Sequence, residues 1–257
     1  MTAITSRRRL LIAGGAALVA ALAASVIVVL TRGPADAPAG KLAAAPVAKP
    51  APSSTAPVPP HHRRVRVPHE TVAAAAPTRF SYRAPAWTIR ANVCGMAYVR
   101  PLDPPGEQHH TVCWVQHGFG FAPGSAGRGT TYVLGHAWAE DPREVLNKIS
   151  ATAMREVLPK IAHHRHRTMS GVATYPVTHL DSDVITLRTS AGSLRYTVRS
   201  AYAVAKADAG SVTALMNQHT EHRVVIITCG ELHGVDYDYN IIVNAFLTSS
   251  QALTSRT

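Results

Sequence analysis

An uncharged apolar run near the N-terminus constrains this chain more than any other feature. Residues 10–30 read LLIAGGAALVAALAASVIVVL and contain no charged side chain. A run of this length can cross a bilayer as one helix, and Arg7, Arg8 and Arg9 directly before it favour a cytoplasmic N-terminus. A cleaved signal peptide is the alternative, although its apolar segment is normally shorter, at roughly 7 to 15 residues. We expect a single-pass membrane anchor, and both interpretations place the C-terminal part outside the cytoplasm.

Composition divides the rest of the chain into a tether and a folded domain. Residues 33–79 are rich in Pro, Ala and Ser and contain almost no aromatic residues. Such a segment buries too little apolar surface to offset the entropy lost on ordering. We therefore expect a basic start and anchor at residues 1–32, a disordered tether at residues 33–79 and one globular domain at residues 80–257.

The net charge of +11 is unevenly distributed. Residues 1–79 carry ten Lys or Arg against two acids, whereas residues 80–257 carry sixteen against thirteen. A nucleic-acid-binding module concentrates its basic residues on a folded face, so this distribution argues against a nucleic-acid partner. It fits attraction of the tether to anionic lipid or wall polymer, and equally fits simple solubility of the tether.

The globular part has the pattern of a mostly β domain. Short runs rich in Val, Ile, Thr and Tyr recur between Gly, Pro, Asp or Ser, as in a barrel or sandwich. VITLRTS and LRYTVRS, joined by an AGS turn, predict a hairpin, whereas residues 224–228 and 240–247 are apolar on both faces and predict central strands. Strands are expected to begin near Trp87, Met96, Thr111, Thr130, Val172, Val184, Leu194, Arg223 and Tyr239.

Two helical segments interrupt the strand pattern. Asp141 as the N-cap, Pro142 at the first helical position and Glu144 at the third predict a helix start, and a second helical stretch is expected at residues 152–161. The run HHRHR at residues 163–167 lacks spaced acidic or Cys partners and predicts an exposed basic loop rather than a metal site. We expect neither a metal nor a cofactor.

The residues that remain for chemistry are a cysteine and a histidine. The common serine-hydrolase, phosphate-loop, zinc-protease and C-x-x-C motifs are absent. A cysteine attacks as its thiolate and needs a neighbouring base, most often a histidine distant in sequence. His136 ends the run TTYVLGH and Cys229 ends RVVIITC, and strand ends at a barrel rim can converge on one cleft. Taken alone, Cys229 is better explained as a buried structural thiol.

The segments TYVLGH and IITCG, followed by YNIIVNA, resemble the His-containing and Cys-containing strands of sortases, with the actinobacterial class F or class E branch most similar. The resemblance extends over roughly residues 86–247, through WTIRANV, FAPGSAGRGTTYVLGH and SLRYTVRSAYAV. It implies an eight-stranded β-barrel with one or two short helices. It also implies that Cys229 attacks a Thr-Gly bond in the C-terminal sorting motif of a surface protein and forms a thioacyl-enzyme. His136 would exchange protons with the leaving and incoming amines, the acceptor being a peptidoglycan or pilin amine of a Gram-positive cell.

The chain departs from the sortase pattern after the cysteine. Sortases carry an arginine on the following strand, but no Arg or Lys lies between Cys229 and the end of NIIVNAFL. The family position falls on Asp238, Tyr239 or Asn240. An acid has the wrong charge, which leaves Tyr239 or Asn240 as neutral donors to the oxyanion, and a neutral donor is generally weaker than a charged one. Two further candidate neighbours of the oxyanion are Thr228 and His233.

The other two cysteines lie in expected early strands. A disulfide between Cys94 and Cys113 would suit an exported domain and leave Cys229 as the remaining thiol, but two buried thiols are an equal alternative.

Three functions therefore stay open at the level of sequence. The first is an active transpeptidase. The second is a catalytically impaired sortase-like domain that binds sorting motifs or wall components, since the arginine is missing. The third is another cysteine acyl-transferase such as an L,D-transpeptidase, which usually shows a Ser-His-Gly-Cys type of motif that this chain lacks.

Overall fold

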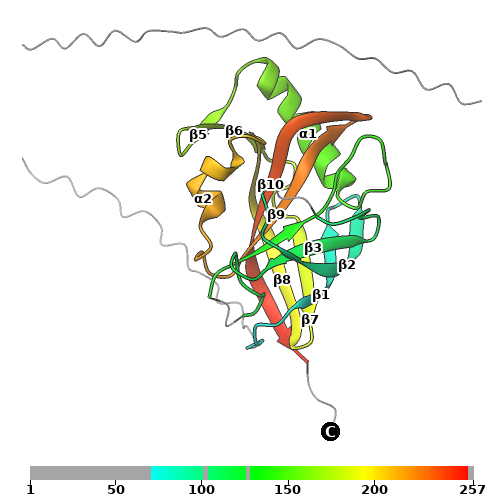
Figure 1. Ribbon diagram of the computed structural model, residues 1–257, viewed down its shortest axis with the longest axis vertical. Coiled ribbons are helices and arrows are strands. Elements are labelled where there is room, and N and C mark those ends of the chain that lie inside the picture. The colour runs from blue at the N-terminus through cyan, green and yellow to red at the C-terminus, as the bar shows by residue number, and fades with distance from the viewer. Residues whose placement is uncertain (1–70, 101–103, 126–127, 254–257) are drawn as a thin grey trace, which may run out of the picture. The chain divides into compact units, whose positions relative to one another are not determined.

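Eight strands pair edge to edge in a closed ring. They are β1 (Pro77–Arg83), β2 (Thr88–Ala97), β3 (Thr111–Gln116), β4 (Thr130–Leu134), β7 (Val184–Thr189), β8 (Gly192–Ala205), β9 (Arg223–Leu232) and β10 (Val235–Ala252). The order in the computed structural model is β10-β9-β4-β3-β2-β1-β7-β8, and a β10–β8 pairing closes the ring (Figure 1). The mostly β fold and the eight-stranded barrel implied by the resemblance are therefore confirmed.

The structure describes residues 71–100, 104–125 and 128–253. The expected anchor at residues 10–30 and nearly all of the expected tether lie outside this part of the chain. In the described part, no helix combines the length and the apolar character needed to cross a membrane. The structured part reaches back before residue 80, because β1 begins at Pro77 and the side chain of Val72 is buried in the core.

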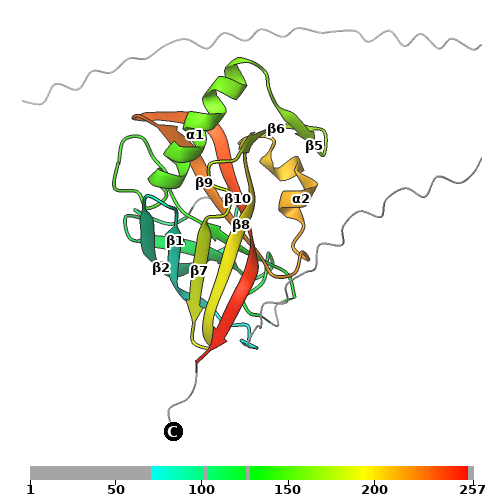
Figure 2. The same ribbon diagram turned by 180° about the vertical axis from the view of Figure 1, so that it is seen from behind.

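Few elements lie outside the ring. These are α1 (Asn147–Ala162), β5 (Arg167–Met169), β6 (Val172–Val177), the short 3-10 helix η1 (Ala209–Ser211) and α2 (Thr213–Met216). β6 pairs with the C-terminal half of β8, and β5 pairs with β6. α1 packs mainly against β9, and Figure 2 shows it from the side opposite to Figure 1.

The helix boundaries differ from the sequence prediction. α1 is one helix that begins after Leu146, so the start expected at Asp141 is wrong and the stretch expected at residues 152–161 is part of α1. The Asp141 carboxylate instead accepts a hydrogen bond of 2.9 Å from the backbone N–H of Arg143. An Asp side chain that binds a backbone N–H two residues on stabilises a turn, and this local signal is similar to that of a helix N-cap.

Several strand limits also differ. β2 contains Met96, where a separate strand was expected, and β1 and β5 were not expected. β9 continues past Cys229 to Leu232, and β10 begins at Val235 rather than near Tyr239. These strand ends could not be predicted from the sequence, because their residues are polar and show no apolar alternation. Backbone hydrogen bonds between β9 and β10 form them instead. The β7–β8 hairpin is confirmed.

β9 is a central strand that is covered on both faces, as expected. Val224 and Ile226 belong to the larger core cluster, which includes barrel residues and α1. Val225 and Ile227 belong to a second cluster that includes Leu134 of β4, residues of β8, and α2. Because side chains alternate along a strand, these two clusters identify the two faces of the sheet around the site.

Candidate active site

The parallel register of β4 and β9 brings His136 and Cys229 to equivalent positions. Leu134 lies opposite Ile227, and the Gly135 N–H donates to the Ile227 carbonyl over 3.3 Å, which continues the ladder past the end of β4. Extended two residues past this last pair, the same register would place His136 beside Cys229. Since side chains alternate, both project from the face that carries Leu134 and Ile227. The two predicted catalytic residues are therefore neighbours on one face of adjacent strands.

Cys229 and His136 line the same cavity, which has a volume of about 490 Å³. Both side chains are half-buried, so the cavity gives solvent and substrate access to them. The described residues around them provide three carboxylates and one ammonium group. The further lining residues are Pro104, Gly106, Glu107, Ala137, Trp138, Glu144, Lys206 and Asp236.

The strand after the cysteine bulges next to Cys229. In the β9–β10 pair, Asn240 lies opposite Cys229 and Tyr237 lies opposite Gly230, so two residues of β10 are inserted between these positions. A bulge of this kind bends the strand and redirects side chains, and bulges are frequent next to active sites. Packing is tight at Gly230, because a Cβ atom at this position would lie 3.1 Å from the sulfur of Met154 and the methionine side chain would have to shift.

A buried serine of α1 holds the strand that carries the cysteine. The Ser150 hydroxyl donates to the carbonyl of Cys229 over 2.7 Å and accepts from the N–H of Glu231 over 2.6 Å. Ser150 thus fixes the backbone on both sides of Gly230. The sequence reasoning missed this residue, although a small polar residue on the buried face of an amphipathic helix was an available signal.

His136 is held by hydrogen bonds from the loop before β3. Its Nε2 atom lies 3.1 Å from the carbonyl oxygen of Pro104, and its backbone N–H donates to the Gln108 side-chain oxygen over 3.3 Å. A carbonyl only accepts, so Nε2 carries the hydrogen in this contact, and Nδ1 is where the neutral ring accepts a proton. Gln108 is buried and was also missed by the sequence reasoning. Its side-chain N–H group contacts the Cys113 sulfur at 3.1 Å.

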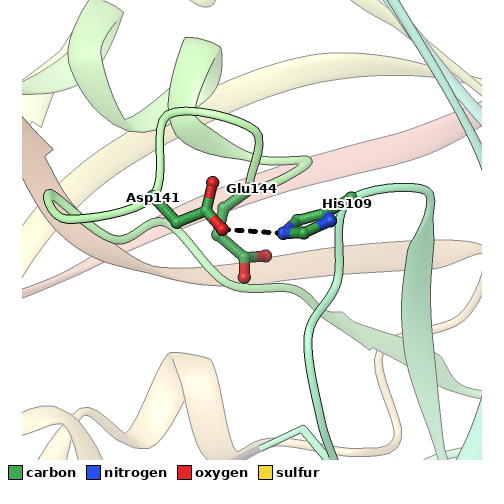
Figure 3. A group of neighbouring side chains, drawn as sticks. All are labelled: His109, Asp141 and Glu144. Carbon is green, nitrogen blue, oxygen red and sulfur yellow. Dashed lines mark hydrogen bonds and ion pairs between the residues drawn. The ribbon is translucent and has the colours of Figure 1, made fainter. Parts of the chain in front are cut away.

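Three titratable side chains gather beside this loop. His109, Asp141 and Glu144 have potential ligand atoms within 4.8 Å of one another, and Figure 3 shows His109 directed at Asp141. All three already have partners, since His109 contacts Asp141 at 2.8 Å and Glu144 accepts from the backbone N–H of Gln108. The Arg143 guanidinium hydrogen-bonded to Asp141 holds the pKa of that carboxyl well below its usual range. We interpret the group as a structural link between two loops that border the cavity.

The structure joins Cys94 and Cys113 in a disulfide with a Cα–Cα distance of 4.4 Å. The two cysteines are register partners of the parallel strands β2 and β3. Cys113 also lies opposite Leu134, two residues before His136, so the cross-link supports the strand that leads to the histidine. The pairing that the sequence left open is thus present, and Cys229 lies outside it.

The four tentative oxyanion residues occupy different places. Asn240 lies directly opposite Cys229, and opposite residues of an antiparallel pair share a face. Thr228 projects from the other face of β9, and its buried hydroxyl has no hydrogen-bond partner in the described part of the chain. Tyr239 packs edge-on against Tyr175, with ring centroids 5.8 Å apart.

His233 is exposed at the hairpin tip with a φ of 54° and lines a different cavity. Of the described residues that line the cavity of Cys229, none is Thr228, His233, Tyr239 or Asn240. Strand alternation excludes Thr228 from the reacting face, Tyr239 packs against Tyr175, and His233 lines a different cavity. Asn240 is therefore the tentative residue whose strand position fits best.

Comparison with known proteins identifies one family. A family model described as the sortase domain matches residues 99–248, which is more than half of the chain. Among curated proteins there is no match. The solved structures to which the chain is similar include sortase A from Listeria monocytogenes, with 13% identity, a TM-score of 0.41 and coverage of 70% of this chain and 92% of that one.

Two other solved structures come from other organisms. A Clostridium perfringens sortase D5 transpeptidase has 13% identity, a TM-score of 0.40 and coverage of 69% of this chain and 82% of that one. A mutant of sortase E from Streptomyces avermitilis has 12% identity, a TM-score of 0.36 and coverage of 72% of this chain and 96% of that one. The class F or class E assignment stays a prediction.

Proposed function

The chain belongs to the sortase family of cysteine transpeptidases, and from this premise we propose that it cleaves a surface protein at a Thr-Gly bond in a C-terminal sorting motif. The acyl group then passes to a cell-wall or pilin amine. One observation carries the assignment of residues: Cys229 and His136 line a single cavity from the same face of adjacent parallel strands. A nucleophile and a base supplied by separate strands are the arrangement that thiol catalysis requires.

The proposed reaction has two half-reactions. In the first, the Cys229 thiolate attacks the carbonyl carbon of the threonine, so that a C–S bond forms and the π-electron pair moves to the oxygen. Collapse of this intermediate restores the carbonyl and breaks the C–N bond, while His136 gives a proton to the leaving amine. The product is a thioacyl-enzyme on Cys229.

In the second half-reaction, an incoming amine attacks the thioester carbonyl and gives a proton to His136. A C–N bond forms, the C–S bond breaks and the thiolate is restored. The contact between His136 Nε2 and the Pro104 carbonyl supports this role, because it orients the imidazole ring in the cavity of Cys229. The Asn240 amide, opposite Cys229, is a neutral donor suited to the oxyanion.

The proposed location is the outer face of a cell membrane. Residues 10–30 would anchor the chain and residues 33–79 would let the domain reach wall polymer or nascent surface proteins. The Cys94–Cys113 disulfide supports an oxidising compartment, where such bonds persist.

The test is transpeptidation by the purified full-length chain in detergent. Peptides with varied sorting motifs are incubated with a triglycine or diaminopimelate amine, and products are identified by mass spectrometry. We expect cleavage at Thr-Gly and an amide product, both lost in Cys229→Ala, whose circular dichroism spectrum should match that of the wild type. Failure to cleave any sorting-motif peptide would refute the proposal.

A motif-binding protein without turnover is the second candidate. It is favoured by the absence of Lys and Arg from β10, the strand next to Cys229. This candidate predicts that sorting-motif peptides bind the wild type and Cys229→Ala equally, with no product after prolonged incubation. Product formation by the wild type would exclude it.

A further inference from the structure

Lys206 is the one lysine or arginine among the described residues that line the cavity of Cys229. It directly follows the last residue of β8, and its backbone N–H donates to the Asp238 carbonyl over 3.2 Å. Asp238 is one of the two residues inserted in the bulge of β10. The hydrogen bond therefore ties the end of β8 to the part of β10 that lies next to Cys229.

The strand register places the Lys206 side chain on the reacting face. In the β8–β10 pair, Val204 lies opposite Asn240, and Asn240 lies opposite Cys229 in the β9–β10 pair. Val204 belongs to the same cluster as Ile227, which identifies its face as that of Cys229. Because side chains two residues apart share a face, Lys206 is expected on the same face as Val204.

Four neighbouring strands therefore present four side chains along this face. Their order is Lys206 directly after β8, Asn240 in β10, Cys229 in β9 and His136 two residues after β4. Lys206 and His136 thus lie on opposite sides of the thiol. Because β10 lies between β8 and β9, the backbones of these two strands are about 10 Å apart. The flexible lysine side chain spans part of this distance, which agrees with Lys206 and Cys229 lining one cavity.

The nearby carboxylates have other partners. Asp236 accepts from the backbone N–H of Ala139 over 3.0 Å, and Glu144 accepts from the backbone N–H of Gln108. No carboxylate of the described residues lies within 4.0 Å of the Lys206 ammonium group as an ion pair. The lysine is exposed at the cavity rim, so its charge is available to a reacting group.

We propose that Lys206 supplies the positive charge of this site and stabilises negative charge first on the Cys229 sulfur and then on the carbonyl oxygen of the bound peptide. The second part rests on the proposed function, whereas the first does not. During attack the electron pair of the carbonyl moves to oxygen, and a cation on the side of Cys229 opposite His136 stabilises that charge without blocking the proton donor. Lys206 transfers no proton in this proposal.

The first experiment tests whether the Lys206 charge activates the Cys229 thiol, and it needs no substrate turnover. Iodoacetamide alkylates the Cys229 thiolate, and the rate is followed by intact mass at pH 7 in the wild type, Lys206→Gln, Lys206→Arg and Lys148→Gln. Lys148 is the matched control, because it is an exposed lysine of α1 that lines a different cavity. We expect Lys206→Gln to react roughly two- to fivefold more slowly, as for a unit charge roughly 4 to 8 Å away in water, with the other two variants near wild type.

Salt separates a charge effect from a structural one. The difference between the wild type and Lys206→Gln should shrink as ionic strength rises from about 0.05 M to about 0.5 M, because salt screens an exposed charge. Equal alkylation rates at low salt, or a difference that salt does not change, would overturn the proposal.

The second experiment measures turnover of a sorting-motif peptide by the same variants. We expect Lys206→Gln to lower kcat about 10- to 100-fold with little change in KM, and Lys206→Arg to retain most of the activity. A wild-type chain that cleaves no peptide, with slow alkylation of Lys206→Gln, would refute the proposed function and support the lysine's charge role. Active wild type with equally active Lys206→Gln would overturn the lysine's role in catalysis and leave the proposed function intact.

Discussion

The two edges of β9 differ in how they build the site. On the β4 side, the register is continuous from Thr130 to Leu134, the strand is fully buried, and a disulfide two strands away lies in the same ladder. On the β10 side, the register is broken by a bulge next to Cys229, and residues 235–240 of β10 are exposed or half-buried. A buried regular pair fixes nucleophile and base, whereas the irregular edge is where charge and substrate contacts can vary.

This difference explains where the chain keeps and departs from the family pattern. His136 and Cys229 follow apolar strands whose burial determines their register. The positive charge that the family carries on this strand is absent from β10, and the residue directly after β8, Lys206, lines the same cavity. An exposed side chain at an irregular edge can be replaced by one from a neighbouring strand with little effect on the core.

Removing the base on the β4 side should have the largest effect. His136→Ala deletes the proton donor and acceptor of both half-reactions, and general acid–base groups contribute typically 10²- to 10⁴-fold. We expect kcat for a sorting-motif peptide to fall by at least about 100-fold while the melting temperature changes little. A loss of less than tenfold would show that another group exchanges the proton.

Removing the disulfide should weaken the β4 side without touching the reacting groups. The Cys94–Cys113 bond closes a loop with a sequence separation of 19, for which loop entropy predicts a stabilisation of about 3 kcal/mol. We expect the double variant Cys94→Ala, Cys113→Ala to lose roughly this amount in urea unfolding of the full-length chain. Activity at temperatures well below the unfolding transition should be retained. An unchanged unfolding free energy would show that strand pairing alone holds β2 and β3.

Loosening the contact between α1 and β9 should have a smaller effect on catalysis. Ser150→Ala removes the hydroxyl that binds the Cys229 carbonyl and the Glu231 N–H, so the thiol is less well positioned. We expect kcat to fall about 10-fold with KM nearly unchanged, since small displacements of a reacting group are costly.

The control for Ser150 is Thr152→Ala, because the Thr152 hydroxyl donates only within α1, to the carbonyl of Lys148. Steady-state kinetics of both variants, measured below their unfolding transitions, give the comparison. Equal kinetics in the two variants would show that Ser150 only stabilises the fold.

Sequence patterns predicted the parts of the fold that depend on apolar periodicity. β4, β9 and the β7–β8 hairpin follow directly from such patterns, and the motif strands identified His136 and Cys229. The polar start of β10 and the extent of β9 beyond Cys229 were missed, because backbone pairing rather than side-chain burial forms them.

The supporting residues of the site were less predictable. Ser150, Gln108 and Lys206 act through contacts between elements far apart in sequence, and the register that brings them together has no local signal. Thr228 was suggested by its position next to Cys229, but strand alternation places adjacent side chains on opposite faces. Register therefore decided which of the tentative residues could approach the thiol.

The central claim is that Cys229 is the nucleophile in a cavity shared with His136. Its most direct test is to mix the full-length chain with a sorting-motif peptide, quench within one turnover, and locate any adduct by intact-mass and peptide mass spectrometry. The account predicts a mass increase equal to the acyl portion up to the threonine, attached to Cys229 and released by hydroxylamine. Peptide cleavage without an adduct, or with the acyl group on another residue, would contradict it.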